Sequence, residues 1–301
     1  MSWNGLADYQ WDAISRMQNG CILAGGVGSG KSRTALAYYC KTNGSDLNPR
    51  FFSPMKKNPQ DLYIITTAQK RDRLEWEAEF PLFLLSTNDE TKNYNHKIVI
   101  DSWNNIKKYA NVENAFFIFD EQRVVGTGVW VKSFLKIAKK NNWILLSATP
   151  GDTWSDYIPV FIANGFYKNR TEFKENHIIY SNFSKFPKID RYVAVGRLVR
   201  LRDKILIQMD YINHTIPHHE AVYVEYDRVL YKTITSQRWN PYKNEPVGSP
   251  SELGYLWRKV VNSDESRQDK VLEIFKKHPR VIIFYNFDYE LEILRNLNYG
   301  E

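Results

Sequence analysis

A glycine-rich segment, GGVGSGKS at residues 25–32, has the residue types and spacing of a loop that binds phosphate groups. The apolar residues 20–24 before it predict a strand, and residues 33–39 after it predict a helix, which is the setting that such a loop requires. Glycines let the backbone approach phosphate oxygens, and the N–H groups at the start of the helix attract an anion. Lys31 adds a positive charge near the β and γ phosphates, and Ser32 offers a hydroxyl to Mg²⁺. The predicted phosphate-binding residues are Gly25, Gly26, Val27, Gly28, Ser29, Gly30, Lys31 and Ser32.

Two adjacent carboxylates, Asp120 and Glu121, directly follow the apolar residues 116–119. The carboxyl end of a buried strand is where open α/β sheets carry their active sites. Hydrolysis of a nucleoside triphosphate needs a carboxylate for the metal and a base for the attacking water. Asp120 is therefore expected to hold Mg²⁺ through water, and Glu121 to orient and deprotonate the nucleophile. An acidic pair of this kind is more often a simple turn when it stands alone, but the phosphate loop favours a catalytic set of Lys31, Asp120 and Glu121.

Short apolar runs predict the strands that position these groups. They lack the alternation of half-buried strands, and most are followed by helix-like segments, which indicates a mostly parallel α/β sheet covered on both faces. Ser147 and Thr149 follow the last run, although hydroxyls at a strand end are also a common structural turn. The runs are residues 20–24, 61–65, 96–100, 115–119 and 142–146.

The pattern changes after residue 180. Residues 197–209 predict a helix, and residues 240–251, rich in Pro, Gly, Asn and Ser, predict an exposed loop. A helix at 268–277 followed by a strand at 280–285 predicts the start of a second α/β lobe.

The composition of the chain constrains its domain number, partners and location less than the motifs constrain its function. The 301 residues allow two domains, and the net charge of +7 with a pI near 9.1 is compatible with a polyanionic partner without requiring one. No run approaches the roughly 18 apolar residues of a membrane span. Two cysteines and an N-terminus unlike a secretion signal predict a cytoplasmic protein. His214, His218, His219 and Glu220 form a polar segment in which a metal site is the less frequent reading.

The order of these motifs resembles that of superfamily 2 helicases and translocases. Gln10, the loop at 25–32, DEQR at 120–123 and SAT at 147–149 stand where that superfamily has motifs Q, I, II and III. Finer features resemble the Swi/Snf-like branch, and particularly its small helicases encoded by bacteriophages. These features are TTAQK at 66–70 with LEWEAEF at 74–80, VIDSW at 99–103, HEAVYVEY at 219–226, KVLEI at 270–274 and VIIFYNF at 281–287.

The resemblance implies a RecA-like P-loop NTPase lobe at residues 1–180, a connecting segment at 181–260 and the beginning of a second RecA-like lobe at 261–301. By position, Tyr9 and Gln10 would recognise adenine, and Ser147 and Thr149 would couple the nucleotide state to lobe movement. Contacts to the nucleic-acid backbone would come from Thr67, Gln69 and Ser102.

The resemblance also implies the function of an ATP-dependent DNA helicase or translocase that uses ATP and Mg²⁺, with little sequence preference, in the host cytoplasm if a phage encodes it. The family's motifs V and VI are absent from these 301 residues, so the isolated chain is expected to turn over ATP weakly or not at all. Two alternatives remain: a regulatory module that binds ATP and DNA without hydrolysis, and a P-loop motor of another kind, such as a packaging ATPase. RNA in place of DNA also remains open.

Overall fold

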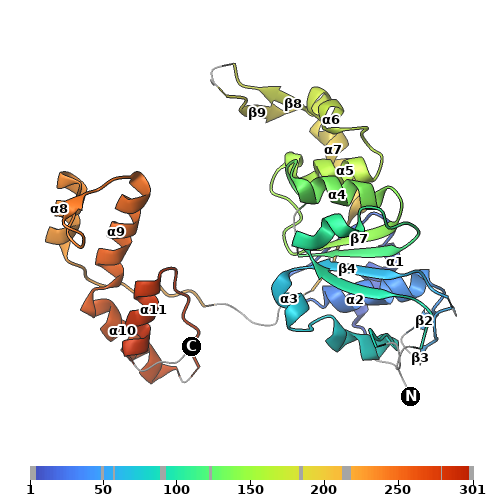
Figure 1. The fold of residues 1–301 in the computed structure, drawn as a ribbon, viewed down its shortest axis with the longest axis horizontal. Helices are drawn as coiled ribbons and strands as arrows, with labels where there is room; N and C mark the ends of the chain where they lie inside the picture. Colours follow the sequence, from blue (N-terminus) through green and yellow to red (C-terminus); the bar gives the residue numbers. More distant parts are fainter. Residues whose placement is uncertain are drawn as a thin grey trace. The chain divides into compact units, whose positions relative to one another are not determined.

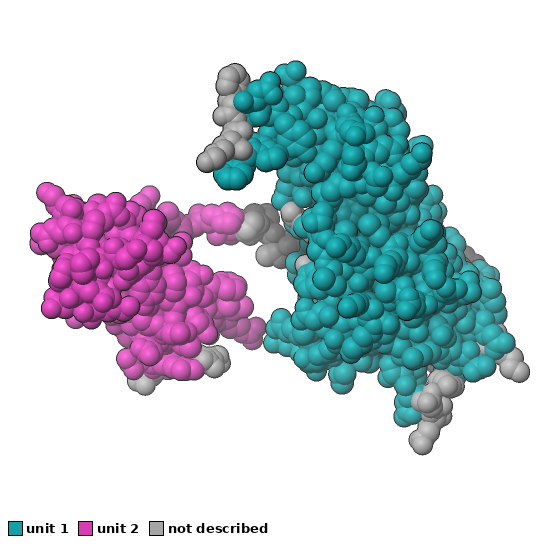
Figure 2. All heavy atoms as spheres, turned by 45° about the horizontal axis from the view of Figure 1, so that its top comes forward, with its two compact units in different colours: residues 1–213 teal, residues 214–301 magenta. Residues whose placement is uncertain are grey.

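The computed structural model describes residues 5–48, 51–56, 58–88, 93–121, 124–182, 186–211, 218–278 and 280–297. The chain forms two compact units, residues 1–213 and 214–301, which are coloured separately in Figure 2. The lobe boundaries after residues 180 and 260 stay a prediction. Within the described ranges, no helix has the length and apolar character needed to cross a bilayer.

A six-stranded sheet forms the centre of the first unit, and every neighbouring pair of its strands is parallel. Its order is β10-β1-β7-β6-β4-β5. The predicted α/β class is therefore confirmed, and each of the five apolar runs supplies one strand. The strands are β1 (Ile22–Ala24), β4 (Leu62–Thr66), β5 (Ile98–Ser102), β6 (Phe116–Asp120), β7 (Asn142–Ser147) and β10 (Leu206–Gln208).

The sixth strand, β10, corrects the prediction of one helix over residues 197–209. Helix α7 (Val195–Ile205) ends where β10 begins, and Leu206 pairs with Ile22 on the free edge of β1. A local helical pattern does not reveal this pairing, because the partner lies far away in the sequence.

Helices cover both faces of the sheet (Figure 1). On β6, Phe116 and Ile118 belong to the core shared with α1 and α2, whereas Phe117 and Phe119 belong to the opposite core. Both faces of β6 are thus buried, as its unbroken apolar sequence requires. The helices of the first core are α1 (Asp8–Arg16), α2 (Lys31–Thr42) and the 3-10 helix η1 (Glu77–Phe83); those of the second include η2 (Trp103–Tyr109), α4 (Val129–Ala138), α5 (Ile158–Ala163) and α6 (Arg170–His177).

Smaller elements complete the first unit. Helix α3 (Ala68–Asp72) follows β4, and the 3-10 helix η3 (Trp154–Tyr157) precedes α5. Two antiparallel ribbons lie outside the main sheet, and Figure 1 shows β8–β9 projecting from the end that carries α6. The ribbons are β2 (Leu47–Asn48) with β3 (Phe51–Phe52), and β8 (Ile178–Tyr180) with β9 (Ile189–Tyr192).

The second unit is mainly helical, with a small core of Ile234, Leu253, Leu256 and Val260. A short ribbon of β11 and β12 begins at Trp239 and extends into residues 240–251, where the sequence predicts only a loop. Its elements are α8 (Arg228–Gln237), β11 (Trp239–Asn240), β12 (Glu245–Pro246), α9 (Pro250–Asn262), α10 (Glu265–Lys277) and α11 (Asp288–Asn296).

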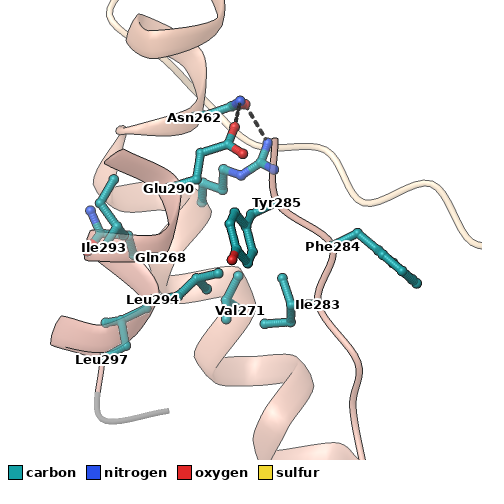
Figure 3. Close-up of a pocket in the computed structure, with 11 residues that line it drawn as sticks. Asn262, Gln268, Val271, Ile283, Phe284, Tyr285, Glu290, Ile293, Leu294 and Leu297 are labelled. Carbon is teal, nitrogen blue, oxygen red and sulfur yellow. Dashed lines mark hydrogen bonds between the residues drawn. The ribbon is translucent and has the colours of Figure 1, made fainter. Parts of the chain in front are cut away.

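The strand predicted at 280–285 is wrong: residues 281–285 have no regular secondary structure. Ile283 and Tyr285 turn toward a small cavity beside α10 and α11, whereas Phe284 points away (Figure 3). Ile282 and Phe284 are 82% and 90% exposed. A strand needs a neighbouring strand for its backbone hydrogen bonds, and the described part of this unit places none beside this segment.

We expect this exposed segment to promote self-association, because an extended apolar stretch without a pairing partner is a template for contact with other chains. Phe284→Ser should therefore reduce the concentration-dependent rise in mass measured by sedimentation velocity. Val229→Ser is the matched control. It removes an exposed apolar side chain from helix α8, outside residues 281–285, and should leave the association unchanged. Equal sedimentation of wild type and Phe284→Ser over the whole concentration range would contradict the expectation.

Candidate active site

The predicted chemical groups meet at one edge of the sheet, because parallel strands all end on the same side. The phosphate loop follows β1, Asp120 ends β6 and Glu121 follows it, and Ser147 ends β7, the strand between β1 and β6. Two backbone hydrogen bonds join these ends: Gly25 N–H donates to the Ser147 carbonyl (3.2 Å), and Glu121 N–H donates to the Leu146 carbonyl (3.2 Å). Residues taken from three separate motifs thus form one contiguous site.

The phosphate loop depends on glycine at particular positions. Gly28 and Gly30 have φ of +82° and +73°, in the region that other residues rarely adopt. A Cβ on Gly30 would also lie 2.4 Å from Gln10 Nε2, and one on Gly25 would lie 2.6 Å from Ser29 Oγ. Helix α2 begins at Lys31, within this loop, so its first N–H groups lie at the place where phosphates are expected.

The Lys31 ammonium contacts the backbone of its own phosphate loop. Its Nζ donates to the carbonyls of Gly25 (2.7 Å) and Gly26 (2.9 Å). Burial lowers the pKa of Lys31, although the carboxylates of Asp120 and Glu121 oppose that shift. A partly desolvated ammonium held by neutral carbonyls has much to gain from an arriving anion.

Asp120 is 1% exposed and held by a dense set of donors. Its Oδ2 accepts from Thr66 Oγ1 (2.9 Å), Lys70 Nζ (3.1 Å) and Trp76 Nε1 (3.2 Å). The backbone carbonyl of Asp120 accepts from Trp103 Nε1 (2.9 Å). Burial raises the pKa of Asp120, and Lys70 and Thr66 offset part of that rise. The sequence analysis predicts none of these four partners for Asp120. The sequence offers one signal: Thr66 ends β4, and the indoles of Trp76 and Trp103 follow β4 and β5.

Glu121 has an unusual backbone, with φ of +57°. This left-handed conformation costs a non-glycine residue about 1–2 kcal/mol, and such outliers concentrate at functional sites. The Glu121 side chain is 43% exposed and its Oε1 pairs with Lys70 Nζ at 2.7 Å. Burial alone would lower the pKa of Lys70, but the two carboxylates outweigh burial and raise it.

A cavity of about 500 Å³ lies beside the phosphate loop, within the size range of small-molecule sites. Tyr9 Oη donates to the Ser29 carbonyl (3.2 Å). Gln10 Nε2 donates to the Gly30 carbonyl (3.2 Å) and Thr34 Oγ1 (3.1 Å). Gln10 therefore stabilises the loop through these hydrogen bonds. The recognition of adenine by Tyr9 and Gln10 stays a prediction. The lining residues are Gly5, Leu6, Ala7, Tyr9, Gln10, Gly28, Gly30, Arg33 and Glu79.

Arg33 and Glu79 are cavity residues that the sequence analysis missed. Arg33 Nε pairs with Glu79 Oε2 at 2.7 Å and closes one side of the cavity. Arg33 stands in the first turn after the phosphate loop, which is the sequence signal that could have identified it.

The oxygen ligands near the loop fit a hydrated hard cation. Ser32 lies in the first turn of α2, and Asp120 offers a carboxylate at the end of β6. Mg²⁺ is commonly bound by one or two carboxylates together with substrate phosphates and water. Among the described residues, no group of three His, Cys, Asp or Glu side chains is arranged to hold a metal, and His214 lies outside them.

Comparison with known proteins gives similarity in fold only. No family model matches the chain, and no curated protein matches it. The Sulfolobus solfataricus SWI2/SNF2 ATPase core in complex with dsDNA matches with a TM-score of 0.53 and 16% identity, over 98% of this chain and 70% of that one. The first unit has a RecA-like fold. Its parallel sheet matches the RecA-like lobe of SWI2/SNF2 ATPase cores.

Two further solved structures are similar to a lesser degree. The Sulfolobus solfataricus SWI2/SNF2 ATPase core domain gives a TM-score of 0.49 at 15% identity, over 98% of this chain and 69% of that one. The Pyrococcus furiosus Hef helicase domain gives 0.38 at 17% identity, over 60% and 43%. The relation to bacteriophage helicases stays a prediction.

In this RecA-like lobe, the predicted nucleic-acid contacts lie just after β4 and at the end of β5. Thr67 caps α3, its hydroxyl accepting from the Lys70 N–H (3.3 Å), and Gln69 is exposed on the same helix. Ser102 is buried at the end of β5. Gln69 is thus the most accessible of the three, and their contacts with nucleic acid stay predictions.

The predicted coupling residues lie next to the phosphate loop. Ser147 is buried and its Oγ accepts from the Thr149 N–H (3.1 Å), which shapes the turn after β7. The Ser147 carbonyl also accepts from Gly25 N–H, which joins this strand end to the phosphate loop. The coupling role of Ser147 and Thr149 stays a prediction. Gln122 and Arg123 of the DEQR motif lie outside the described residues.

Asp101, beside Ser102, links α3 to η2 in the first unit. Its carboxylate accepts from Arg71 Nη1 (3.2 Å), Asn105 Nδ2 (2.8 Å) and Tyr109 Oη (2.6 Å), and from the Ser102 N–H (2.7 Å). Burial alone would raise the pKa of Asp101, but these hydrogen bonds outweigh burial and lower it. Asp101 therefore acts as an ionised anchor for the segment that carries the predicted nucleic-acid contacts.

A carboxyl whose pKa is lower in the folded state stabilises the fold above its unfolded pKa of about 3.9, and this contribution is lost as the pH falls through the folded pKa. We therefore expect the stability difference between wild type and Asp101→Asn to be largest near neutral pH and to shrink below about pH 4. Urea unfolding over a pH series measures this difference. Asp72→Asn, which removes the exposed partner of Arg71, is the control. A difference that stays constant across the series would rule out ionised Asp101 as the anchor.

Proposed function

We propose that this chain is an ATP-dependent DNA translocase or helicase module, in which the first unit binds Mg·ATP and contacts the nucleic-acid backbone. The observation that carries the proposal is the meeting of Lys31, Asp120 and Glu121 at one edge of a parallel sheet. Similarity in fold to a SWI2/SNF2 ATPase core solved with dsDNA supports DNA as the partner.

Each residue has a role that follows from its chemistry. The loop N–H groups and the start of α2 bind phosphate oxygens, and Lys31 neutralises their charge. Ser32 and Asp120 would hold Mg²⁺, which when bound would supply positive charge to the phosphates. Glu121 orients a water molecule and accepts its proton as the water attacks the γ phosphorus and ADP leaves.

Nucleic-acid binding follows from charge and from the segments after β4 and β5. The net charge of +7 suits contacts with phosphates, which give strong salt dependence and little sequence preference. Thr67, Gln69 and Ser102 are the proposed contact residues. Ser147 and Thr149 are proposed to pass the nucleotide state to the rest of the chain.

A regulatory module that binds ATP and DNA without hydrolysis is the second candidate. One observation favours it: Lys70 Nζ holds Oε1 of the Glu121 carboxylate at 2.7 Å, so this oxygen is engaged by the ammonium and not by a water molecule.

The decisive experiment measures ATP binding and phosphate release with no nucleic acid, single-stranded DNA, double-stranded DNA or RNA. DNA-stimulated release that Lys31→Ala and Glu121→Gln both lose would support the motor. Binding of ATP and DNA without release would favour the regulatory module. Failure of the wild type to bind ATP would overturn both proposals.

A further inference from the structure

Lys70 lies between the two carboxylates of the proposed catalytic site. It belongs to α3, and its ammonium contacts Asp120 Oδ2 at 3.1 Å and Glu121 Oε1 at 2.7 Å. The Lys70 side chain is only 19% exposed. One ammonium thus serves two carboxylates, of which Asp120 is almost completely removed from solvent.

The Lys70 ammonium supplies the counter-charge that the buried Asp120 carboxylate requires. A buried carboxylate that loses its only nearby counter-charge is strongly destabilising, because its desolvation is no longer compensated. Lys31 is directed instead at the carbonyls of Gly25 and Gly26. Lys70 is therefore the cation in direct contact with Asp120 and Glu121 in the described structure.

A divalent cation at Asp120 would compete with Lys70 for the same carboxylate. Oδ2 already accepts from Thr66, Lys70 and Trp76, and of these donors only Lys70 carries a charge. Two cations that favour the same carboxylate repel one another, so the binding of either weakens the other.

We propose that Lys70 is a positioning residue that holds Asp120 and Glu121 as an internal counter-cation, and that it must release them before a divalent cation binds. The proposal rests on the proposed function, since it assigns the metal to Asp120. Its consequence is that Lys70 keeps the metal affinity of the nucleotide-free protein low and keeps Glu121 engaged until the metal arrives.

Mn²⁺ serves as the probe, because its free ion gives an electron paramagnetic resonance signal that binding removes. The titration is done without ATP or DNA on the full chain. Lys70→Met is expected to bind Mn²⁺ about tenfold more tightly than the wild type, which is within the usual range of coupling between two sites. Lys70→Arg keeps the charge and is expected to bind as weakly as the wild type.

Lys31→Met is the matched control, because it removes a neighbouring positive charge that does not contact the carboxylates directly. Its Mn²⁺ affinity should rise much less than that of Lys70→Met. An equal rise in both variants, or no rise in Lys70→Met, would overturn the proposal. If Lys70→Met does not fold, Lys70→Gln removes the charge while keeping a hydrogen-bond donor, and the same comparison decides.

The outcomes separate this proposal from the proposed function. Wild type that binds no ATP overturns the function whatever the Mn²⁺ affinities are. Wild type that binds ATP, with Lys70→Met equal to it in Mn²⁺ affinity, overturns only the role of Lys70.

Discussion

The Lys31→Ala variant is expected to lose ATP affinity about a hundredfold while keeping the stability of the wild type. Removing one partner of a desolvated charge pair costs about 3 kcal/mol, which corresponds to roughly two orders of magnitude in Kd. In the protein without ligand, Lys31 contacts only neutral carbonyls of its own loop among the described residues, so its removal should cost the fold little. Isothermal titration with ATP and thermal unfolding measure the two effects.

Lys41→Ala is the control for this comparison, because Lys41 is an exposed lysine in the last turn of the same helix, α2. It removes an equal charge from the far end of the helix and should leave ATP affinity unchanged. Similar losses in both variants would mean that overall charge rather than the phosphate loop governs binding.

Substitutions of Glu121 are expected to separate stability from activity. Glu121→Gly and Glu121→Ala both lose the carboxylate and its contact with Lys70, but only alanine keeps the steric cost of a positive φ. Glu121→Gly should therefore be more stable than Glu121→Ala by about 1 kcal/mol. Both should lose most of whatever weak DNA-stimulated phosphate release the wild type shows, because a general base usually contributes about 10²- to 10⁴-fold.

Urea unfolding and a phosphate-release assay test these two effects independently. Equal stability of the glycine and alanine variants would show that the left-handed backbone at Glu121 carries no strain. Unchanged phosphate release in both variants would remove Glu121 from the role of base.

The parts of the fold that could be predicted are those encoded locally. The loop at 25–32 and the pair Asp120–Glu121 each follow an apolar run, and strand ends in a parallel sheet meet at one edge. That rule suffices to bring the loop and the carboxylates together. The assignment of their ligands stays a prediction.

The parts that could not be predicted depend on distant partners. β10 pairs with β1, although most of the sequence of the first unit lies between them. Thr66, Lys70 and Trp76 contact Asp120 from the neighbouring strand β4 and the residues after it. No local pattern specifies such contacts. The strand expected at 280–285 failed for the converse reason, since its apolar sequence does not show whether a neighbouring strand is present.

The two indoles that donate hydrogen bonds to Asp120 are also fluorescent groups next to the site. Trp76 and Trp103 donate to the side chain and to the backbone of Asp120, and both are buried. Indole emission responds to the field of nearby charges, so the departure of an ammonium or the arrival of a metal at Asp120 alters the fluorescence of two of the nine tryptophans in the chain. Trp76 and Trp103 would thus serve as an optical reporter at Asp120, the most deeply buried carboxylate among the described residues.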